Sequence, residues 1–301
     1  MIEATVSEGD AMAMRLPGGF QAAARRRRSL AVGLSFVALL ILTYVSLYTV
    51  RGQNLDNLSM EALRAGTEWL PSVLSGLQSL VSVPALVVMS LVVAGIAAFR
   101  RRGALAARAL IVVGAANVVS QFLKGVLGRP ELGVGISLPN SYPSGHVTYA
   151  AAIAFALVMV APHRLRSTFA AFGWAWTTLM SLMVISMGWH RLADVLAALL
   201  IVTFWGCLAA PAEAGRAGTS TRSNVVQGLA WGALLCGVGL FAAAAATYSS
   251  RVGTPLTLAE LYALTAHGTR AGTVMAAATF LLPAGLAGVI FNGVDRLGGG
   301  Q

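Results

Sequence analysis

Residues 121–146, QFLKGVLGRPELGVGISLPNSYPSGH, and residues 188–194, GWHRLAD, carry most of the reactive side chains of this chain. Each stretch stands where one long apolar run ends and the next begins. Apolar runs of about 20 residues favour helices that cross a bilayer. The two stretches therefore predict polar loops at the ends of membrane helices, and we take them as the centre of the protein.

The composition supports this interpretation. The chain has 301 residues, of which 57% are hydrophobic and 11% charged, whereas soluble domains carry about 25% charged residues. The net charge of +10 raises the alternative of nucleic-acid binding, but no basic face with interleaved aromatic residues is present. The two cysteines, Cys207 and Cys236, lie inside apolar runs, and their spacing favours neither a disulfide nor a metal site.

The apolar runs predict an all-α fold, a polytopic membrane helix bundle with about eight spans. Six spans form a core and two additional C-terminal spans follow it. Residues 51–76 between the first two spans have loosely spaced leucines and a tryptophan, which predicts an amphipathic helix lying at the membrane interface. The expected spans cover residues 29–50, 77–99, 104–123, 147–161, 168–189, 195–210, 225–247 and 271–291.

This pattern divides the chain into four parts. Residues 1–28 form a cytoplasmic tail, residues 29–210 the core, residues 211–224 a small, polar linker on the cytoplasmic side, and residues 225–301 the two-span extension. The extension looks like an appendage. We leave open whether it is a lateral wall of the bundle or the contact surface of a homo-oligomer.

Arginines predict the orientation of the bundle. They cluster at residues 25–28 and 100–102 and recur in alternate loops, and such cation-rich loops face the cytoplasm. An even number of spans then places both termini in the cytoplasm. Both quoted stretches fall on the extracytoplasmic side of a multi-pass protein of the cell membrane.

The sequence PSGH at residues 143–146 directly precedes an apolar run. Ser144 suits the N-cap of the following helix, and the first backbone N–H groups of a helix lack partners within it and favour an anion. Gly145 allows an anion to approach the backbone closely, and His146 can donate a proton. An ordinary helix cap with an interfacial histidine is the alternative interpretation.

His190 and Asp194 are four residues apart, a spacing that puts two side chains on one face of a helix. Asp194 can accept from one ring nitrogen and leave the other basic, as a nucleophilic histidine requires. A carboxylate at the edge of a span is costly without a partner and is by default functional. A purely structural His–Asp pair is the alternative.

Three cations complete the candidate site. Lys124 is the single lysine among 21 basic residues, which suggests that its position needs a compact ammonium group. Lys124 and Arg129 frame the sequence GVLG and can donate to phosphate oxygens, or can instead reach toward lipid headgroups. Arg191 has the same two interpretations.

Together these residues resemble the type 2 phosphatidic acid phosphatase superfamily, whose signature consists of KxxxxxxRP, PSGH and SRxxxxxHxxxD. PSGH is intact at residues 143–146, HxxxD is intact at His190 and Asp194, and Lys124 fits the first lysine. The resemblance covers about residues 77–210. Two positions depart from it, because Glu131 and Val184 stand where the family has arginine. Arg129-Pro130 occurs two positions early, and Arg191 is a candidate substitute.

The resemblance implies a phosphatase-like core and a membrane enzyme that hydrolyses a lipid phosphate or diphosphate, of the phosphatidate or polyprenyl-phosphate type, without metal or other cofactor. His190 would attack phosphorus with Asp194 orienting it, His146 would protonate the leaving oxygen, and a phosphohistidine would form. Lys124, Arg129, Ser144, Gly145 and Arg191 would bind phosphate oxygens. A phosphotransferase with the same histidine chemistry and a non-catalytic lipid-phosphate-binding protein are the alternatives.

Overall fold

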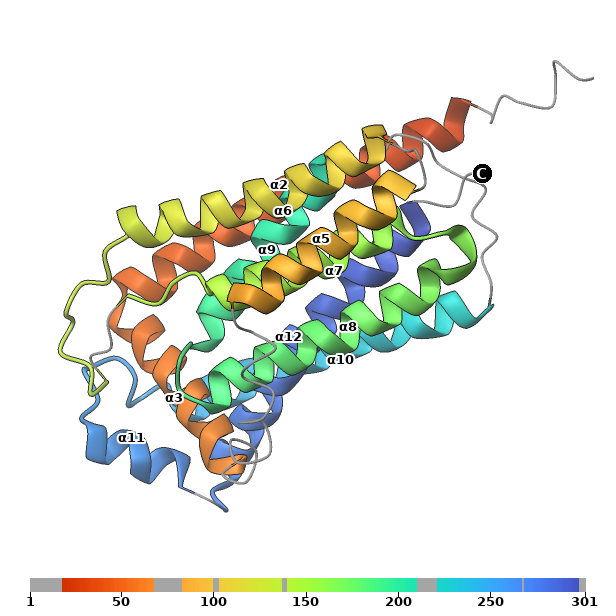
Figure 1. Cartoon of the computed structure of the whole chain (residues 1–301). Coiled ribbons are helices and arrows are strands. Elements are labelled where there is room, and N and C mark those ends of the chain that lie inside the picture. Colours follow the sequence, from red (N-terminus) through yellow and green to blue (C-terminus); the bar gives the residue numbers. More distant parts are fainter. Residues whose placement is uncertain are drawn as a thin grey trace, which may run out of the picture.

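The computed structural model describes residues 18–67, 83–99, 103–136, 140–209, 221–266 and 268–297. All regular secondary structure within these ranges is helical (Figure 1), as the sequence predicts. Residues 1–17 of the predicted tail, Arg100 to Arg102 and residues 210–220 of the predicted linker lie outside the described residues.

A helix occurs at each of the eight predicted runs. Six helices among the described residues are long and apolar enough to cross a membrane, so the chain is a multi-pass membrane protein. One of the others, α7, has only 16 residues. The eight helices are α2 (Gly18–Tyr48), α5 (Val83–Phe99), α6 (Gly103–Val126), α7 (Gly145–Val160), α8 (His163–Ser186), α9 (Leu192–Ala209), α10 (Thr221–Thr247) and α12 (Arg270–Leu297).

The short helix α7 is the centre of the bundle. Its residues from Val147 to Val160 are buried, apart from Tyr149 at intermediate exposure, and it packs against α5, α6, α8 and α9. A helix that is apolar on all sides is stable only inside a protein or a bilayer. The peripheral helices α2 and α10 expose residues such as Leu34 and Leu235, as expected of a lipid-facing surface.

Small residues allow the helices to approach closely. A Cβ atom on Gly206 of α9 would lie 2.4 Å from the Phe155 ring of α7, and one on Gly173 of α8 would lie 2.7 Å from the Phe291 ring of α12. Association of helices in a bilayer relies on such close packing, because lipid tails are as apolar as the side chains.

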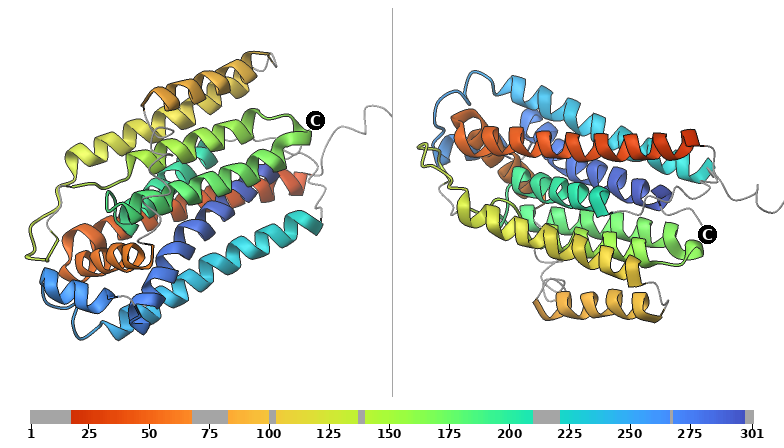
Figure 2. Two further views of the ribbon diagram at one scale, coloured as in Figure 1. Left: turned by 60° about the horizontal axis from the view of Figure 1, so that its bottom comes forward. Right: turned by 90° about the horizontal axis from the view of Figure 1, so that it is seen from above.

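The interpretation of both C-terminal helices as an appendage is wrong for α12. Phe291 belongs to the main buried cluster, and Trp174 of α8 donates from Nε1 to the Ala284 carbonyl at 2.7 Å. The left view of Figure 2 shows α12 beside α8, with α10 on its outer side. Hydropathy does not separate the two helices, since both are apolar, and only their packing does.

The segment after α2 also differs from its prediction in its described part, residues 51–67, while residues 68–76 with the tryptophan lie outside the described residues. It forms α3 (Val50–Gly66), capped by Thr49, whose Oγ1 accepts from the Gly52 N–H at 3.0 Å. Its residues from Gly52 to Leu63 are buried except for Leu55, and the polar ones among them are enclosed by protein. The helix therefore packs into the end of the bundle, and protein covers both its polar and its apolar side chains.

Loops from distant parts of the chain make that burial favourable. Asn54 donates from Nδ2 to the carbonyls of Val252 at 3.1 Å and Thr254 at 2.8 Å. Gln53 donates from Nε2 to the carbonyls of Leu47 at 2.7 Å and Pro130 at 3.0 Å. Buried polar groups are tolerated when they are hydrogen-bonded. The loop from 248 to 257 and the short α11 (Leu258–Thr265) complete this end of the molecule (Figure 1).

Candidate active site

Both quoted stretches lie at the end of the bundle formed by α3 and α11 (Figure 1). The first leads from α6 to α7, and the second contains the turn between α8 and α9. The Ser144 N–H donates to the Asp194 carbonyl at 3.0 Å and so joins the two stretches directly. Residues about 50 positions apart are thus brought into one site.

The predicted helix cap at PSGH is present. Ser144 is the N-cap of α7, with φ −69° and ψ 112°, and its Oγ accepts from the Val147 N–H at 3.3 Å. A Cβ atom on Gly145 would lie 3.1 Å from the Gln121 amide nitrogen, so a larger residue would crowd this position. The first N–H groups of α7 have no partner within the helix and favour an anion before it.

The predicted His–Asp pair is also present. His190 Nδ1 lies 3.3 Å from Asp194 Oδ2, and both side chains are buried. His190 is in the turn before α9 rather than on the helix, which begins at Leu192. Asp194 Oδ2 accepts further bonds from the Arg191 N–H at 3.0 Å and from the Ser141 hydroxyl. The carboxylate is therefore fixed by groups from both stretches.

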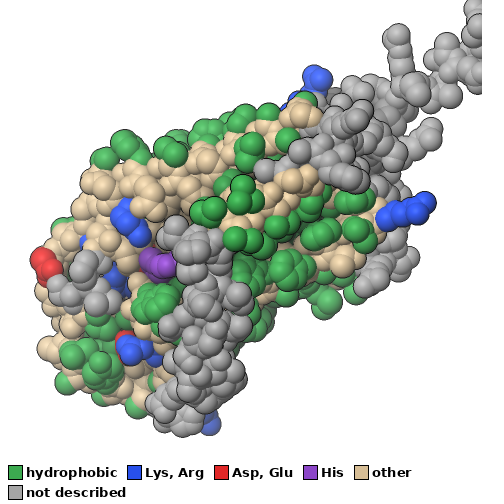
Figure 3. All heavy atoms as spheres, in the orientation of Figure 1, with side chains coloured by type: hydrophobic (Ala, Val, Ile, Leu, Met, Phe, Trp, Pro, Cys, Tyr) green, Lys and Arg blue, Asp and Glu red, His purple; other side chains and the backbone are tan. Residues whose placement is uncertain are grey.

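The two histidine rings meet at this end of the bundle. Their centroids are 5.9 Å apart with an interplanar angle of 67°, and the Trp189 ring lies 5.7 Å from His146. Because Nδ1 of His190 faces Asp194, the other ring nitrogen, Nε2, is directed away from the carboxylate. Figure 3 shows histidine beside Lys or Arg side chains at this end.

Lys124 lies in the last turn of α6. It is half-buried and close enough to Asp194 and His146 to interact with both electrostatically. An ammonium in this position favours an anion between the two rings.

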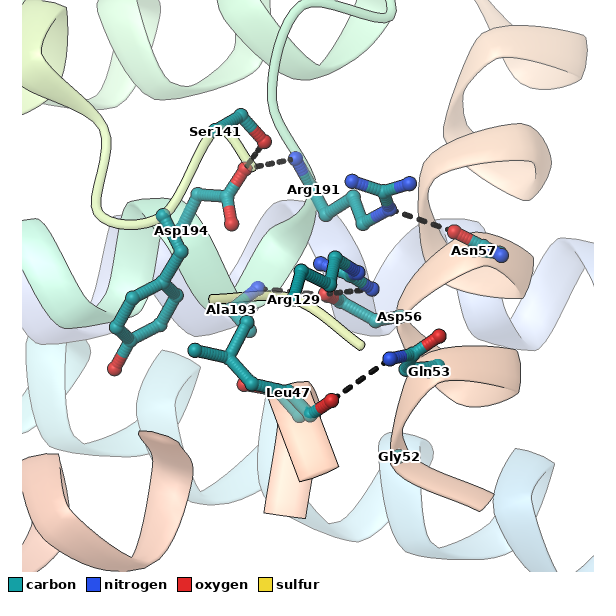
Figure 4. Close-up of polar contacts among 12 residues, drawn as sticks. Leu47, Gly52, Gln53, Asp56, Asn57, Arg129, Ser141, Arg191, Ala193 and Asp194 are labelled. Carbon is teal, nitrogen blue, oxygen red and sulfur yellow. Dashed lines mark hydrogen bonds and ion pairs between the residues drawn. The ribbon is translucent and has the colours of Figure 1, made fainter. Parts of the chain in front are cut away.

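The two arginines contact residues of α3, which the sequence does not predict as part of the site (Figure 4). Arg191 is fully buried, and it donates from Nε to Asn57 Oδ1 at 2.6 Å and from Nη2 to the Ile136 carbonyl at 3.2 Å. The Arg129 side chain is 6% exposed, and its Nη2 lies 3.5 Å from Asp56 Oδ2. Both partners, Asp56 and Asn57, belong to α3.

Sequence reasoning missed Asp56, Asn57 and Ser141. The sequence does contain a signal for the first two. The run QNLDN at residues 53–57 has four polar side chains among five residues, and its Asp56 is one of only 11 acidic residues in the chain. Such a polar run predicts a solvated helix at the membrane interface and therefore does not predict burial.

Burial dominates the electrostatics of these groups. It raises the pKa of the Asp56 carboxyl to about 6, while the Arg129 guanidinium lowers it and the charge of Asp194 raises it further. Burial, together with the charge of Arg129, lowers the pKa of the Arg191 guanidinium. Three cations and two carboxylates therefore share this region, and an anion is favoured there.

The two departures from the family signature have different surroundings. Val184 is fully buried in α8, and its carbonyl accepts from the N–H groups of Trp189 at 3.0 Å and His190 at 3.1 Å. Glu131 is exposed in the loop after Arg129. Neither side chain can donate to phosphate, whereas Arg129 and Arg191, which can, belong to the two quoted stretches.

A cavity of about 340 Å³ opens next to this site. Arg64 and Glu61 of α3 form an ion pair of 2.7 Å on its wall, and Gly188, with φ +69°, stands close to the Arg64 guanidinium. The remaining lining residues are Met60, Gly135, Ile136, Met187, Leu258 and Tyr262. Two of these belong to α11, so the C-terminal extension contributes to the surroundings of the site.

Fold and site together define a class of protein: a multi-pass helical membrane protein with two histidines, an aspartate and several cations at one end of its bundle. Residues 105–216 match the model of the PAP2 superfamily. The matched segment contains both motif stretches and confirms the resemblance to this superfamily. Helices α2, α3, α5 and α10 to α12 lie outside it.

One solved structure is similar to this chain, a crystal structure described as the first transmembrane PAP2 type phosphatidylglycerolphosphate phosphatase from Bacillus subtilis. The TM-score is 0.48 with 23% sequence identity, over 59% of this chain and 93% of that chain. No curated protein matches the sequence.

Proposed function

We propose that this protein is an integral membrane phosphatase that hydrolyses a lipid phosphate or diphosphate through a phosphohistidine intermediate. The observation that carries the proposal is the meeting of His146 and His190 at 5.9 Å, with Asp194 on the Nδ1 side of His190. The PAP2 match over residues 105–216 supports phosphatase chemistry in general terms.

In the first step, Nε2 of His190 attacks phosphorus and the bond from phosphorus to the lipid oxygen breaks. His146 gives its proton to that leaving oxygen, and Asp194 stabilises the positive charge that His190 acquires. In the second step, His146 takes a proton from water, whose oxygen attacks phosphorus, and the bond from phosphorus to His190 breaks. Inorganic phosphate leaves and both histidines return to their starting states.

The cations and the helix end bind the phosphoryl oxygens in this proposal. Lys124, Arg129 and Arg191 offer positive charge, while Ser144 and Gly145 offer the N-terminus of α7. Phosphoryl transfer depends mainly on positioning and on stabilising charge that spreads over the equatorial oxygens. A substrate whose lipid tail lies along the apolar bundle would present its phosphate at this depth.

We further propose that the site faces the extracytoplasmic side and that both termini are cytoplasmic. Arg28, in the arginine cluster of α2, donates to the Cys207 carbonyl near the end of α9 at 3.1 Å. The first turns of α2 and the C-terminal end of α9 lie away from α3 and α11 (Figure 1). Cation-rich ends face the cytoplasm, which favours the opposite end for the site.

The test is phosphate release from phosphatidate, phosphatidylglycerophosphate and polyprenyl mono- and diphosphate by the detergent-purified chain. We expect release with at least one substrate, and its loss in His190→Ala and His146→Ala at unchanged thermal unfolding. Normal turnover by His190→Ala would exclude the mechanism. Transfer of the phosphoryl group to an added alcohol without phosphate release would favour a phosphotransferase.

A further inference from the structure

Two adjacent residues of α3 hold two arginines from separate loops (Figure 4). Asn57 Oδ1 accepts from Arg191 Nε at 2.6 Å, across 134 positions of sequence. Asp56 Oδ2 lies 3.5 Å from Arg129 Nη2, and its Oδ1 accepts from the Ala193 N–H at 2.9 Å. One turn of helix therefore determines where both guanidinium groups lie.

The same groups leave buried donors without hydrogen-bond partners. In the part of the chain that the structure describes, these are Arg129 Nη1 and Nη2, Arg191 Nη1 and Asn57 Nδ2. Such orphaned buried donors are rare in native proteins and point to a missing ligand, ion or water. Two acceptors, Asp56 Oδ2 and Asp194 Oδ1, also lack hydrogen-bond partners, but each carboxylate already lies beside a cationic or histidine side chain.

Charge in this region is not balanced by protein alone. Arg129 and Arg191 both act on the single carboxylate Asp56, and the second carboxylate, Asp194, is engaged by His190, Ser141 and a backbone N–H. The charge of Arg129 also disfavours the charged form of Arg191 and so lowers its pKa. An anion with several oxygens would satisfy the free donors and relieve this repulsion.

We propose that Asn57 and Asp56 are positioning residues, which hold the guanidinium groups of Arg191 and Arg129 for the phosphoryl group bound between His146 and His190. This inference rests on the proposed function. It extends the site to α3, which lies outside the segment that matches the family.

The competing explanation is that both contacts only fasten α3 to the loops. In that case, loss of the Asn57 acceptor lowers stability and leaves the affinity for phosphate unchanged. Asn54 provides a matched control, because it is buried on the same helix and bonds to the carbonyls of Val252 and Thr254 rather than to an arginine.

The experiment uses the full chain in detergent and orthovanadate, a phosphate analogue. It measures the inhibition constant, the vanadate-dependent rise in Tm and the KM for a substrate that the wild type hydrolyses. We expect Asn57→Leu to weaken vanadate binding and raise KM by about tenfold to a hundredfold, the effect of one hydrogen bond to a charged group. Asn54→Leu is expected to stay within about threefold of the wild type, since it loses no such bond.

A double-mutant cycle separates positioning from fastening. If Asn57 acts through Arg191, Asn57→Leu weakens vanadate binding by less than about threefold in an Arg191→Lys background, because the interaction is already lost. Unchanged vanadate affinity in the single variant, or the same loss in both backgrounds, would overturn the proposal for Asn57.

Asp56→Asn is the second variant, for use if Asn57→Leu does not fold. It keeps an oxygen for the Ala193 N–H and removes the ion pair with Arg129. We expect Asp56→Asn to weaken vanadate binding in the wild-type background and to have little further effect in an Arg129→Lys background. Losses of affinity that add in the double variant would contradict this. If the wild-type protein neither releases phosphate nor binds vanadate, the proposed function itself is refuted. The wild type is measured first, so this outcome is distinguished from a failure of the positioning proposal.

Discussion

Asp194→Asn tests the charge behind the proposed nucleophile. The substitution keeps the shape of a side chain that is fully buried and removes its negative charge. At the position of Oδ2, three donors now converge: His190 Nδ1, the Arg191 N–H and the Ser141 hydroxyl. An amide that presents its NH2 group there would also favour the wrong tautomer of His190.

The expected loss follows from the distance. His190 becomes cationic when it bonds to phosphorus, and a unit charge at 3.3 Å from Asp194 interacts with it by about 5 kcal/mol at an effective dielectric constant of about 20. Removal of this interaction slows the chemical step by about 10³- to 10⁴-fold. Substrate binding is less affected, because His190 carries no such charge before the attack.

The assay is kcat for phosphate release in detergent, with Tm as a check on folding. Ser141→Ala is the control, since it removes one donor and leaves the carboxylate, and a fall in kcat of about tenfold or less is expected from one hydrogen bond. An Asp194→Asn protein that folds and retains kcat within about threefold of the wild type would refute the reasoning, because orientation and charge would then contribute less than about 1 kcal/mol.

Two further predictions concern stability. Gly206→Leu forces a side chain into the Phe155 ring, which lies 2.4 Å from the added Cβ, and we expect the free energy of unfolding to fall by about 1–3 kcal/mol. Gly239→Ala is the control, because nothing lies within 4 Å of its added Cβ, and it should change the free energy of unfolding by no more than about 1 kcal/mol. Thermal unfolding measures both. The pKa of Asp56 is raised to about 6 in the folded protein, so the folded state binds more protons than the unfolded state between about pH 4 and pH 6. The resulting stabilisation is fully present below about pH 4 and is lost as the pH rises through about 6. The total change in the free energy of unfolding is on the order of 3 kcal/mol. Asp56→Asn should abolish this pH dependence of Tm, and an identical pH profile in both proteins would contradict the assignment to Asp56.

The sequence alone predicted the eight apolar helices and two local contacts of the candidate site. Apolar runs of span length report directly on helices, because a bilayer requires every backbone group to be paired within its own segment. PSGH predicted the N-cap at Ser144, and the four-residue spacing predicted the contact of His190 with Asp194, although His190 is in the turn before α9 and not on the helix. These are local patterns, and local backbone geometry determines them.

The place of α3 was not predictable in the same way. The run at residues 53–57 reads as a solvated face, because an isolated amphipathic helix with these polar groups would lie at the interface. In the fold, Asn54 donates to carbonyls about 200 positions away, and Asn57 Oδ1 accepts from Arg191. The hydrogen-bond partners of a buried polar residue come from distant parts of the chain, and the hydropathy of its own segment does not identify them.

The sequence by itself therefore determined which apolar runs become long helices and that Ser144 caps one of them. Only the tertiary structure decided that α12 is inside the bundle while α10 is outside, and that Asp56 and Asn57 hold the two arginines. The physical reason is that apolar side chains with similar transfer free energies fit lipid or protein equally well, so steric complementarity and hydrogen-bond partners choose between them.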